Sequence, residues 1–468
     1  MIKRTLKQVA EMCGGNSRGF EPTTIIEGVA IDSRSVRPGQ LFVPIVGERF
    51  DGHQFAKQAM EQGASAMLWQ ANRSLPEELT TIPRILVKDT LIALQQLAKA
   101  YRSELMTRVI GVTGSNGKTT TKDLLAAVLA TVYDVHKTEG NLNNEIGLPL
   151  TILQLAEETE VAVLEMGMSE FGEIELLSNI AQPDAAIITN IGESHMVSLG
   201  SRAGIAKAKL EIITGLNEQG LLLINGDDDI LTQQMQEKSI DEMTFDTRTF
   251  GLLSHNDWSA AIVALAEDKS EFNVYYNGES SSLENVVLKV PGKHNISNAL
   301  AVIAAARFFG VSAEKIKQGL LTAQITGMRI ESTLAFNGAK LFNDCYNASP
   351  SSVKAAIDYV AGLSNYKRRF VVLGDMLDLG EQERNMHEEI GEYVVNHPID
   401  VLLGYGPLTV ETIRVANEGK ASSTAYHFQQ KEQLVDWLKQ QLTAEDVVLV
   451  KGSRGMQMEE VVTLLEKG

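Results

Sequence analysis

A glycine-containing loop between an apolar segment and a helical one constrains this chain more than any other feature. Residues 109–113 read Val-Ile-Gly-Val-Thr, which predicts a buried strand, and a helix is expected over about residues 119–131. Between them, backbone N–H groups and a helix N-terminus can surround a phosphate. Lys118 can reach the β- and γ-phosphates of a nucleotide, and the Thr119 hydroxyl can bind Mg²⁺. The segment therefore predicts a phosphate-binding loop in an α/β domain.

The loop departs from the general phosphate-loop pattern at one position. That pattern has a glycine five residues before the glycine of Gly-Lys, and Val112 stands there in this chain. The chain thus has a shortened Gly-x-x-Gly-Lys-Thr form. The alternative is a tight turn with an incidental lysine, which the strand and the helix on either side disfavour.

Strands alternate with helices in the remaining sequence, which predicts mainly parallel sheets covered by helices on both faces. After the loop, strands are expected at 161–165, 185–190 and 221–225, and an apolar helix at 295–310. A second alternation begins near residue 327 and has a Rossmann-like outline without a Gly-x-Gly-x-x-Gly motif. Its expected strands are 369–373, 400–403, 425–428 and 447–450, and its expected helices are 351–363, 384–396, 432–442 and 456–465.

We expect an α/β protein of three domains. They are a small α/β N-terminal domain at 1–105, a central ATPase-like domain with the phosphate loop at 106–325, and a Rossmann-like C-terminal domain at 326–468. In the first of these, a strand is expected at 40–45 and helices at 55–63 and 91–105.

Composition limits the partners and the compartment. The 468 residues carry 42 Lys+Arg against 60 Asp+Glu, a net charge of -18, which disfavours nucleic acid and anionic membranes as partners. A hydrophobic fraction of 44% suffices for several cores. Two cysteines, Cys13 and Cys345, provide no disulfide framework, and neither a signal peptide nor a spanning segment is evident. We expect a cytoplasmic monomer.

Acidic and imidazole groups follow the expected strands of the central domain. Glu165 and His195 lie after strand C-termini, on the same sheet edge as the loop, where they could bind Mg²⁺ carried by a nucleotide. The alternatives are a first-turn or capping charge for Glu165 and an ordinary surface or core histidine for His195. Lys207 and Lys209 are two residues apart in an expected helix, and composition alone favours a solvated helix face for both.

Several polar segments are ambiguous when they are considered without context. The amide-rich residues 141–147 could contact a ligand or form turns. Asn295 could cap the apolar helix, and Ser349 or Ser351 could cap the helix after residue 350. Residues 374–380 and 451–455 follow strands of the C-terminal alternation, where ligand sites form in α/β sheets.

These motifs together resemble the Mur ligase family of peptidoglycan synthesis, over nearly the whole chain. The family's shortened phosphate loop accounts for Val112. The same order of motifs continues through Glu165, His195, residues 225–228, residues 292–295 and Arg329. Residues 32–34 (Asp-Ser-Arg), 50–53, 344–350 and 372–380 resemble the branch of the family that adds D-alanyl-D-alanine to UDP-N-acetylmuramoyl-tripeptide. That branch usually has Asn-Pro where this chain has Ser349-Pro350, and no Asp-Asn-Pro-Arg motif of the diaminopimelate-adding branch is present.

The resemblance implies a role for each candidate residue, with ATP and two Mg²⁺ ions as cofactors. The implied catalytic residues are Lys118, His195 and Lys209, and the implied metal ligands are Thr119, Glu165 and His195. The implied ATP-binding residues are Gly114, Ser115, Asn116, Gly117, Lys118, Thr119, Thr120, Asn295, Arg329 and Asp344. Lys209, with Lys207 as the fallback, matches a lysine that is carbamylated in the family. The implied substrate-binding residues are Ser33, Arg34, Asn141, Asn143, Asn144, Asn347, Asp375, Lys451 and Ser453.

The implied reaction forms an amide bond through an acyl phosphate. Folylpolyglutamate synthase, a related ligase with a similar loop, is an alternative that the Asp-Ser-Arg motif disfavours. An ATP-hydrolysing nucleotide switch and a non-catalytic binder of wall precursors are alternatives from other classes. Intact Lys118, Glu165 and His195 disfavour the binder.

Overall fold

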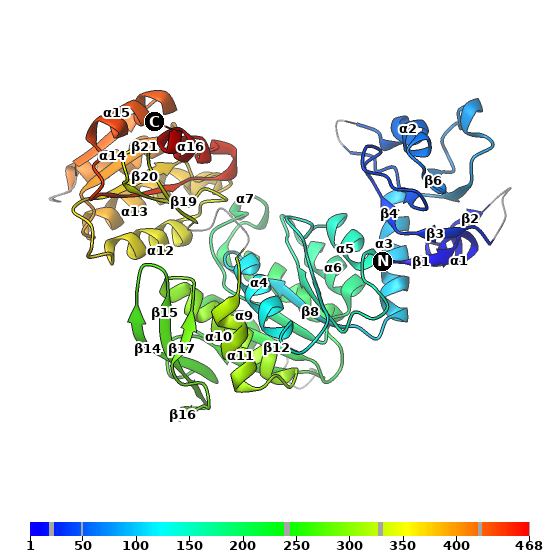
Figure 1. Ribbon diagram of the computed structural model, residues 1–468, viewed down its shortest axis with the longest axis horizontal. Helices are drawn as coiled ribbons and strands as arrows, with labels where there is room; N and C mark the ends of the chain where they lie inside the picture. The colour runs from blue at the N-terminus through cyan, green and yellow to red at the C-terminus, as the bar shows by residue number, and fades with distance from the viewer. Residues whose placement is uncertain (18–22, 48–49, 238–243, 326–330, 420–423, 468) are drawn as a thin grey trace.

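Three lobes, each built around its own β-sheet, make up the computed structural model, which describes residues 1–17, 23–47, 50–237, 244–325, 331–419 and 424–467 (Figure 1). The N-terminal and C-terminal lobes stand apart on either side of the central lobe. Each lobe mixes helices with mainly parallel strands, and the expected α/β class with mainly parallel sheets is confirmed.

The central lobe contains a ten-stranded sheet whose main part is parallel. Its parallel strands run in the order β9-β10-β8-β11-β12-β13-β14. Their bounds are β8 (Arg108–Thr113), β9 (Val135–Lys137), β10 (Val161–Glu165), β11 (Ala185–Ile188), β12 (Leu221–Asn225), β13 (Asp246–Phe250) and β14 (Trp258–Leu265). The antiparallel strands β15 (Ser270–Tyr276), β16 (Glu279–Ser280) and β17 (Val286–Leu288) extend the sheet beyond β14.

Helices cover both faces of this sheet because the side chains of its central strand alternate between two apolar cores. Ile110 and Val112 pack with α4 (Lys118–Leu129), α10 (Lys293–Phe308) and α11 (Ala313–Thr322). Val109 packs with the helices of the other face, which are α3 (Thr90–Glu104), α5 (Gly147–Leu153), α6 (Glu173–Ala181) and α8 (Arg202–Lys209). The phosphate loop between β8 and α4 is therefore anchored in both cores at the carboxyl edge of the sheet.

The C-terminal lobe has a six-stranded sheet in the order β18-β19-β23-β20-β21-β22, parallel except for β18. Its strands are β18 (Glu331–Leu334), β19 (Lys340–Asp344), β20 (Arg369–Gly374), β21 (Val401–Tyr405), β22 (Thr424–Phe428) and β23 (Val447–Lys451). Its helices are α12 (Pro350–Ala361), α13 (Glu383–Val395), α14 (Thr409–Glu418), α15 (Lys431–Gln441) and α16 (Glu459–Lys467). Sequence patterns did not predict β18, β19 or α14. In β19, Leu341 and Phe342 are the only apolar residues.

The N-terminal lobe has a five-stranded sheet in the order β2-β7-β6-β5-β4. Its strands are β2 (Asn16–Ser17), β4 (Val29–Ala30), β5 (Leu41–Phe42), β6 (Ala66–Gln70) and β7 (Arg84–Val87), with β1 (Lys3–Thr5) and β3 (Ile25–Glu27) forming a separate pair. Two helices, α1 (Leu6–Met12) and α2 (Ala56–Glu61), complete this lobe together with α3. Within the described ranges, no helix has both the length and the apolar character that crossing a bilayer requires.

Candidate active site

The phosphate loop has two glycines at positions where a side chain could not fit. Gly114 has φ 146°, and a Cβ atom there would lie 1.8 Å from Thr189 Oγ1. Gly117 has φ 82°, and its Cβ would lie 2.7 Å from Asn298 Oδ1. Both positions lie in the positive-φ region that glycine adopts without strain. The loop is thus packed tightly between the β11 edge and α10.

Residues directly after β11 hold the loop in shape. The Thr189 hydroxyl donates to Asn116 O at 2.5 Å, and Asn190 accepts the N–H groups of Ser115 and Asn116, each at 3.0 Å. Our sequence reasoning did not identify Thr189 and Asn190 as part of the site. Both residues directly follow the C-terminus of a strand, in the segment that leads to His195, and this position could have identified them from the sequence.

Glu165 and Thr119 meet beside the loop. The Thr119 hydroxyl donates to Glu165 Oε2 at 2.9 Å, and Asn143 Nδ2 donates to Oε1 at 2.8 Å. Glu165 is 3% exposed, so its carboxylate is held in one orientation. Lys118, at the start of α4, donates from Nζ to Gly114 O at 2.7 Å.

This donor set fits a Mg²⁺ ion that is carried by a nucleotide. Mg²⁺ prefers oxygen ligands and commonly combines one or two protein oxygens with substrate phosphates and water. Among the described residues, no three His, Cys, Asp or Glu side chains gather closely enough to hold a metal by themselves. A carboxylate and a hydroxyl next to a phosphate loop are instead what a phosphate-borne ion requires.

Burial separates the two lysines of α8. Lys207 is exposed, whereas Lys209 is 2% exposed. The solvated-face interpretation is therefore right for Lys207 and wrong for Lys209. Burial, and then the nearby charge of Lys118, lower the pKa of Lys209 well below its usual range. An uncharged amine is a nucleophile, so Lys209 is chemically suited to covalent modification.

His195 lies close enough to Lys118 and Lys209 for the charge state of each lysine to affect it. Its backbone has φ 68° at the start of the short helix α7 (Met196–Leu199). Burial is the largest of the causes that lower the pKa of His195 below its ordinary value of 6.5. His195 is thus predominantly neutral at pH 7, the state in which an imidazole can bind a metal.

We expect the imidazole of His195 to titrate with a midpoint below 6.5 in the folded protein. The physical reason is that burial, the largest cause of the shift, disfavours the imidazolium. An NMR titration of the ring proton signals measures this midpoint, with His195→Gln to assign them and the urea-unfolded chain as reference. The unfolded chain binds this proton more readily than the folded protein does. The contribution of His195 to the free energy of unfolding therefore falls as the pH drops below 6.5. A midpoint at or above the unfolded reference would contradict this electrostatic account.

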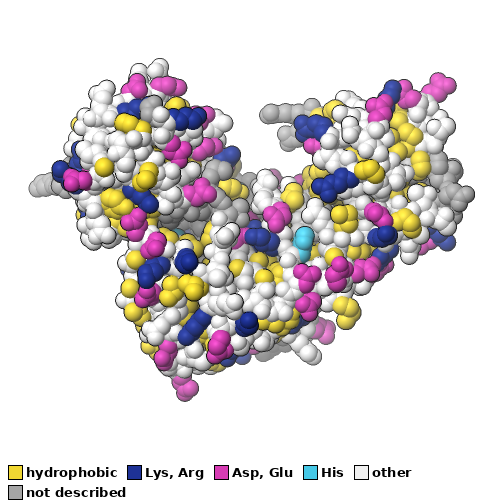
Figure 2. All heavy atoms as spheres, viewed as in Figure 1, with side chains coloured by type: hydrophobic (Ala, Val, Ile, Leu, Met, Phe, Trp, Pro, Cys, Tyr) yellow, Lys and Arg dark blue, Asp and Glu magenta, His cyan; other side chains and the backbone are white. Residues whose placement is uncertain are grey.

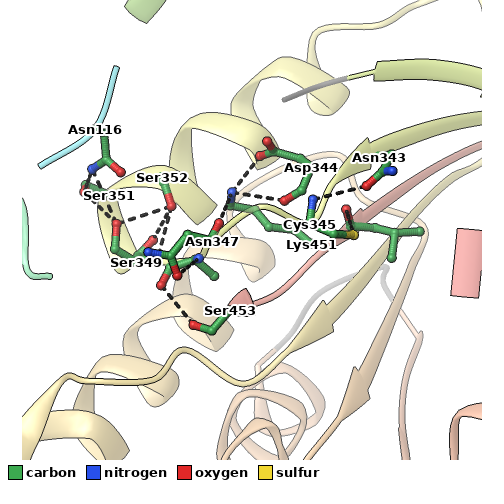
Figure 3. Close-up of polar contacts among 12 residues, drawn as sticks. Asn116, Asn343, Asp344, Cys345, Asn347, Ser349, Ser351, Ser352, Lys451 and Ser453 are labelled. Carbon is green, nitrogen blue, oxygen red and sulfur yellow. Dashed lines mark hydrogen bonds and ion pairs between the residues drawn. The ribbon is translucent and has the colours of Figure 1, made fainter. Parts of the chain in front are cut away.

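A cavity of about 410 Å³ joins the central and C-terminal lobes over the loop. It is lined by Ser115, Asn116, Gly117, Lys118, Thr120 and Asn295 from the central lobe and by Asp344, Asn347 and Lys451 from the C-terminal lobe. In the C-terminal lobe, Lys451 Nζ lies 2.6 Å from Asp344 Oδ2 and donates to Asn347 O at 2.9 Å (Figure 3). Residues that were expected to bind ATP and residues that were expected to bind the second substrate thus share one cavity.

The two lobes also touch directly at the loop. Asn116 Nδ2 donates to Ser351 Oγ at 3.1 Å (Figure 3). The Ser351 N–H donates to Glu193 Oε2 at 3.2 Å. Ser349 caps α12 together with Ser352, as its position before Pro350 suggested. The N-terminus of α12 therefore rests against the phosphate loop.

The structure places the other residues that were predicted to contact ligands in different surroundings. Asn295 is 4% exposed and does not cap α10, because the helix begins at Lys293 with Gly292 as its cap, so the capping interpretation is wrong. Asn141 and Asn144 are both exposed, and Asn144 Oδ1 accepts the N–H of Gly147 at the start of α5. Arg329 lies outside the described residues.

Asp375 and Ser453 are engaged within the C-terminal lobe. Asp375 is 1% exposed and accepts N–H groups from Leu408 and Thr409, the latter at 2.8 Å, where α14 begins. Ser453 Oγ accepts the N–H of Leu377 at 2.8 Å. Neither residue lines the 410 Å³ cavity. Their hydrogen bonds order the loops that follow β20 and β23.

Ser33 and Arg34 follow β4 in the N-terminal lobe. The Ser33 hydroxyl donates to Gln58 at 2.8 Å. Arg34 is exposed and pairs with Asp32, which lowers the pKa of that carboxyl to about 2. Asp32 lines a second cavity, of about 550 Å³, with Arg37, His136 and Gln154 where the N-terminal lobe meets the central lobe.

The N-terminal and C-terminal lobes face each other across an open hollow, which Figure 2 shows.

Comparisons with known proteins cover almost the whole chain. Residues 25–102, 112–306 and 328–454 match the profiles of the "Mur ligase family, catalytic domain", the "Mur ligase middle domain" and the "Mur ligase, glutamate ligase domain". The chain is 48% identical to the UDP-N-acetylmuramoyl-tripeptide–D-alanyl-D-alanine ligase of Bacillus subtilis (strain 168), over 99% of this chain and 98% of that protein.

Two solved structures resemble this chain along most of its length. A crystal structure of MurF from Acinetobacter baumannii superposes with a TM-score of 0.89 at 31% identity and covers 100% of both chains. MurF from Thermotoga maritima, solved in complex with ADP, superposes with a TM-score of 0.81 at 28% identity and covers 94% of this chain and 97% of that one.

Proposed function

The chain belongs to the Mur ligase family, and from this premise we propose that it is an ATP-dependent ligase that joins D-alanyl-D-alanine to UDP-N-acetylmuramoyl-tripeptide. The observation that carries the proposal is the 410 Å³ cavity, in which the phosphate loop faces Asp344, Asn347 and Lys451 of the C-terminal lobe. Such a cavity can bring a nucleotide and a second substrate together. The names of the relatives, including one with bound ADP, support both the reaction and the use of ATP.

The reaction proceeds in two steps. A terminal carboxylate oxygen of the tripeptide attacks the γ-phosphorus of ATP, the bond to the β-phosphate oxygen breaks, and an acyl phosphate and ADP form. The amine of D-alanyl-D-alanine then attacks the acyl carbon, phosphate leaves, and the nitrogen loses a proton. Both steps depend mainly on positioning and on the neutralisation of charge.

The residues of the chain supply this positioning. Lys118 and the N-terminus of α4 offset the repulsion between a carboxylate and a polyphosphate. The contact of α12 with Asn116 allows the C-terminal lobe to close over the nucleotide and exclude water. Three domains at 1–105, 106–325 and 326–468 would hold the UDP precursor, ATP and the dipeptide respectively.

Two Mg²⁺ ions complete the proposed site. Thr119 and Glu165 would hold one with the nucleotide phosphates, and His195 with a carbamylated Lys209 would hold the other. Bound Mg²⁺ supplies Lewis-acid neutralisation of the charge that develops on phosphate oxygens. The buried and easily deprotonated amine of Lys209 supports its carbamylation, which yields an anion next to His195.

The residues proposed to contact the UDP precursor lie in the N-terminal and central lobes. Ser33 and Arg34 would face the UDP part of the precursor, and Asn141, Asn143 and Asn144 the peptide. A cytoplasmic location agrees with two buried cysteines that form no disulfide.

The dependence of phosphate release on substrates tests the proposed function. We expect rapid release from ATP only when UDP-tripeptide and D-alanyl-D-alanine are both present, and one amide product per phosphate. A folylpolyglutamate synthase-like ligase would instead respond to a folate and glutamate. A nucleotide switch would hydrolyse ATP on contact with a partner and yield no amide, an outcome that would overturn the proposal.

A further inference from the structure

A second lysine on α4 is buried beneath the phosphate loop and is not used by the mechanism above. The side chain of Lys122 is 1% exposed, and its Nζ donates to the main-chain carbonyl of Thr138 at 2.8 Å. Burying an ammonium group is costly unless it gains compensating partners. Its placement one turn after Lys118 therefore calls for an explanation.

The partner of Lys122 leads directly to the proposed metal ligand. Thr138 follows β9 and is fully buried, and its hydroxyl accepts the main-chain N–H of Glu165 at 3.0 Å. Its own N–H donates to Val163 O at 3.0 Å. Lys122 thus fixes Thr138 from one side while Thr138 fixes the backbone of Glu165 from the other.

The hydrogen bonds form a closed circuit that returns to α4. Glu165 Oε2 accepts the hydroxyl hydrogen of Thr119 at 2.9 Å, and Thr119 precedes Lys122 by one helical turn. The path runs from α4 through Thr138 to the end of β10 and back to α4. A displacement of any member would move the carboxylate of Glu165 relative to the Thr119 hydroxyl.

Charge balance inside this circuit comes from Asp123. Its side chain is fully buried, and its Oδ1 lies 3.2 Å from Lys122 Nζ and 2.7 Å from Lys137 Nζ. Lys137, on β9, is 29% exposed, and within the described part of the chain it hydrogen-bonds neither to the Thr138 carbonyl nor to Glu165. It shares the carboxylate of Asp123 with Lys122, which makes it a matched control.

We propose that Lys122 is a positioning residue that, through Thr138, sets the Glu165 carboxylate in place for nucleotide-borne Mg²⁺. This inference rests on the proposed function, because it presupposes that a metal–nucleotide complex binds at the loop. A purely structural ion pair would stabilise the fold without a specific effect on metal binding.

The test compares metal binding and nucleotide binding in the full-length protein. Mn²⁺, as a probe for Mg²⁺, is titrated by electron paramagnetic resonance in the presence of ADP, and ADP affinity is measured by calorimetry in EDTA. For Lys122→Met we expect the Mn²⁺ dissociation constant to rise about 10-fold, the lower end of the effect of losing groups that support a metal ligand, because Lys122 acts on Glu165 through Thr138. The affinity for ADP in EDTA should stay within about twofold, because no phosphate contact is removed.

Two further variants make the test specific. Thr138→Val should weaken Mn²⁺ binding in the same direction, and Lys122→Met/Thr138→Val should add little to either single change, because both act on one path. Lys137→Met should leave Mn²⁺ binding within about twofold of wild type. If Lys122→Met does not fold, Thr138→Val alone decides, since it removes one hydroxyl and keeps the ion pair.

The possible outcomes separate this inference from the proposed function. Unchanged Mn²⁺ binding in folded Lys122→Met or Thr138→Val, or an equal loss of ADP affinity with and without metal, would overturn the positioning role. A wild-type protein in which ADP does not promote Mn²⁺ binding would overturn the metal–nucleotide premise itself, and the inference with it.

Discussion

Replacing Lys118 with alanine should lower phosphate release that depends on both substrates by about a thousandfold or more. The Nζ atom of Lys118 lies 2.7 Å from Gly114 O, inside the cavity where the nucleotide phosphates are expected. In the proposed reaction, the carboxylate of the tripeptide must approach the polyphosphate of ATP. Both groups are anions, and the chain itself has a net charge of -18, so the positive charge of Lys118 is needed between them. Without that cation, the repulsion between the two anions is opposed by fewer groups as the transition state forms.

Steady-state phosphate release, with both substrates at saturation, measures this effect. Circular dichroism melting of Lys118→Ala provides the control for folding, because the side chain contacts the loop backbone. A folded Lys118→Ala protein that retains more than about a tenth of the wild-type rate would show that the loop lysine is not the principal source of charge neutralisation.

The second large effect is expected at Lys209. Lys209→Ala should lower the ligase rate by about a hundredfold or more, because it removes the group proposed to become an anionic metal ligand. The residue is 2% exposed, and burial together with the charge of Lys118 lowers its pKa, so its free amine can add to carbon dioxide and release a proton. Short carboxylic acids should restore part of the activity by taking the place of the carbamate.

Lys207→Ala is the matched control for Lys209→Ala. Lys207 lies on the same helix two residues earlier and is exposed, so its loss should change the rate by less than about twofold. Carbon-13 NMR with labelled bicarbonate should show a carbamate signal in wild type that Lys209→Ala lacks. A Lys209→Ala protein of normal activity, or a carbamate signal that persists in it, would remove this role.

The sheet and the phosphate loop could be predicted because local pattern determines them. Strands such as β10 and β11 are continuous apolar runs, and a glycine loop between such a strand and a helix has few other uses. The order of Glu165 and His195 after strand ends placed both on the correct edge of the sheet. Strand β19 was not predicted because it has only two apolar residues, and its pairing with β23, about a hundred positions away, is not visible in a local pattern.

The roles of individual polar residues depended on burial, which spacing does not determine. The sequence pattern does not distinguish Lys207 from Lys209, yet Lys207 is exposed to solvent and Lys209 is buried. Asp375 follows a strand as a ligand residue would, but its carboxylate binds the N–H groups at the start of α14. Asn190 and Lys122 support the loop and Glu165 through contacts between different elements.

The overall charge of the chain is reconciled with anionic substrates by local structure. Three lysines, Lys118, Lys293 and Lys451, line one cavity together with two aspartates, Asp227 and Asp344, so lysines outnumber carboxylates there although the whole chain is acidic. Asp344 balances Lys451 in the same cavity. The local charge around this cavity therefore differs from the net charge of the chain.

The most direct test of the account follows oxygen from the tripeptide to phosphate. UDP-tripeptide labelled with ¹⁸O in its terminal carboxylate is converted with ATP and D-alanyl-D-alanine, and the released phosphate is analysed by mass spectrometry. An acyl-phosphate ligase transfers one labelled oxygen to each phosphate and leaves the other in the new amide carbonyl. Phosphate that carries no label would show that ATP is hydrolysed by water, and would contradict the proposed function.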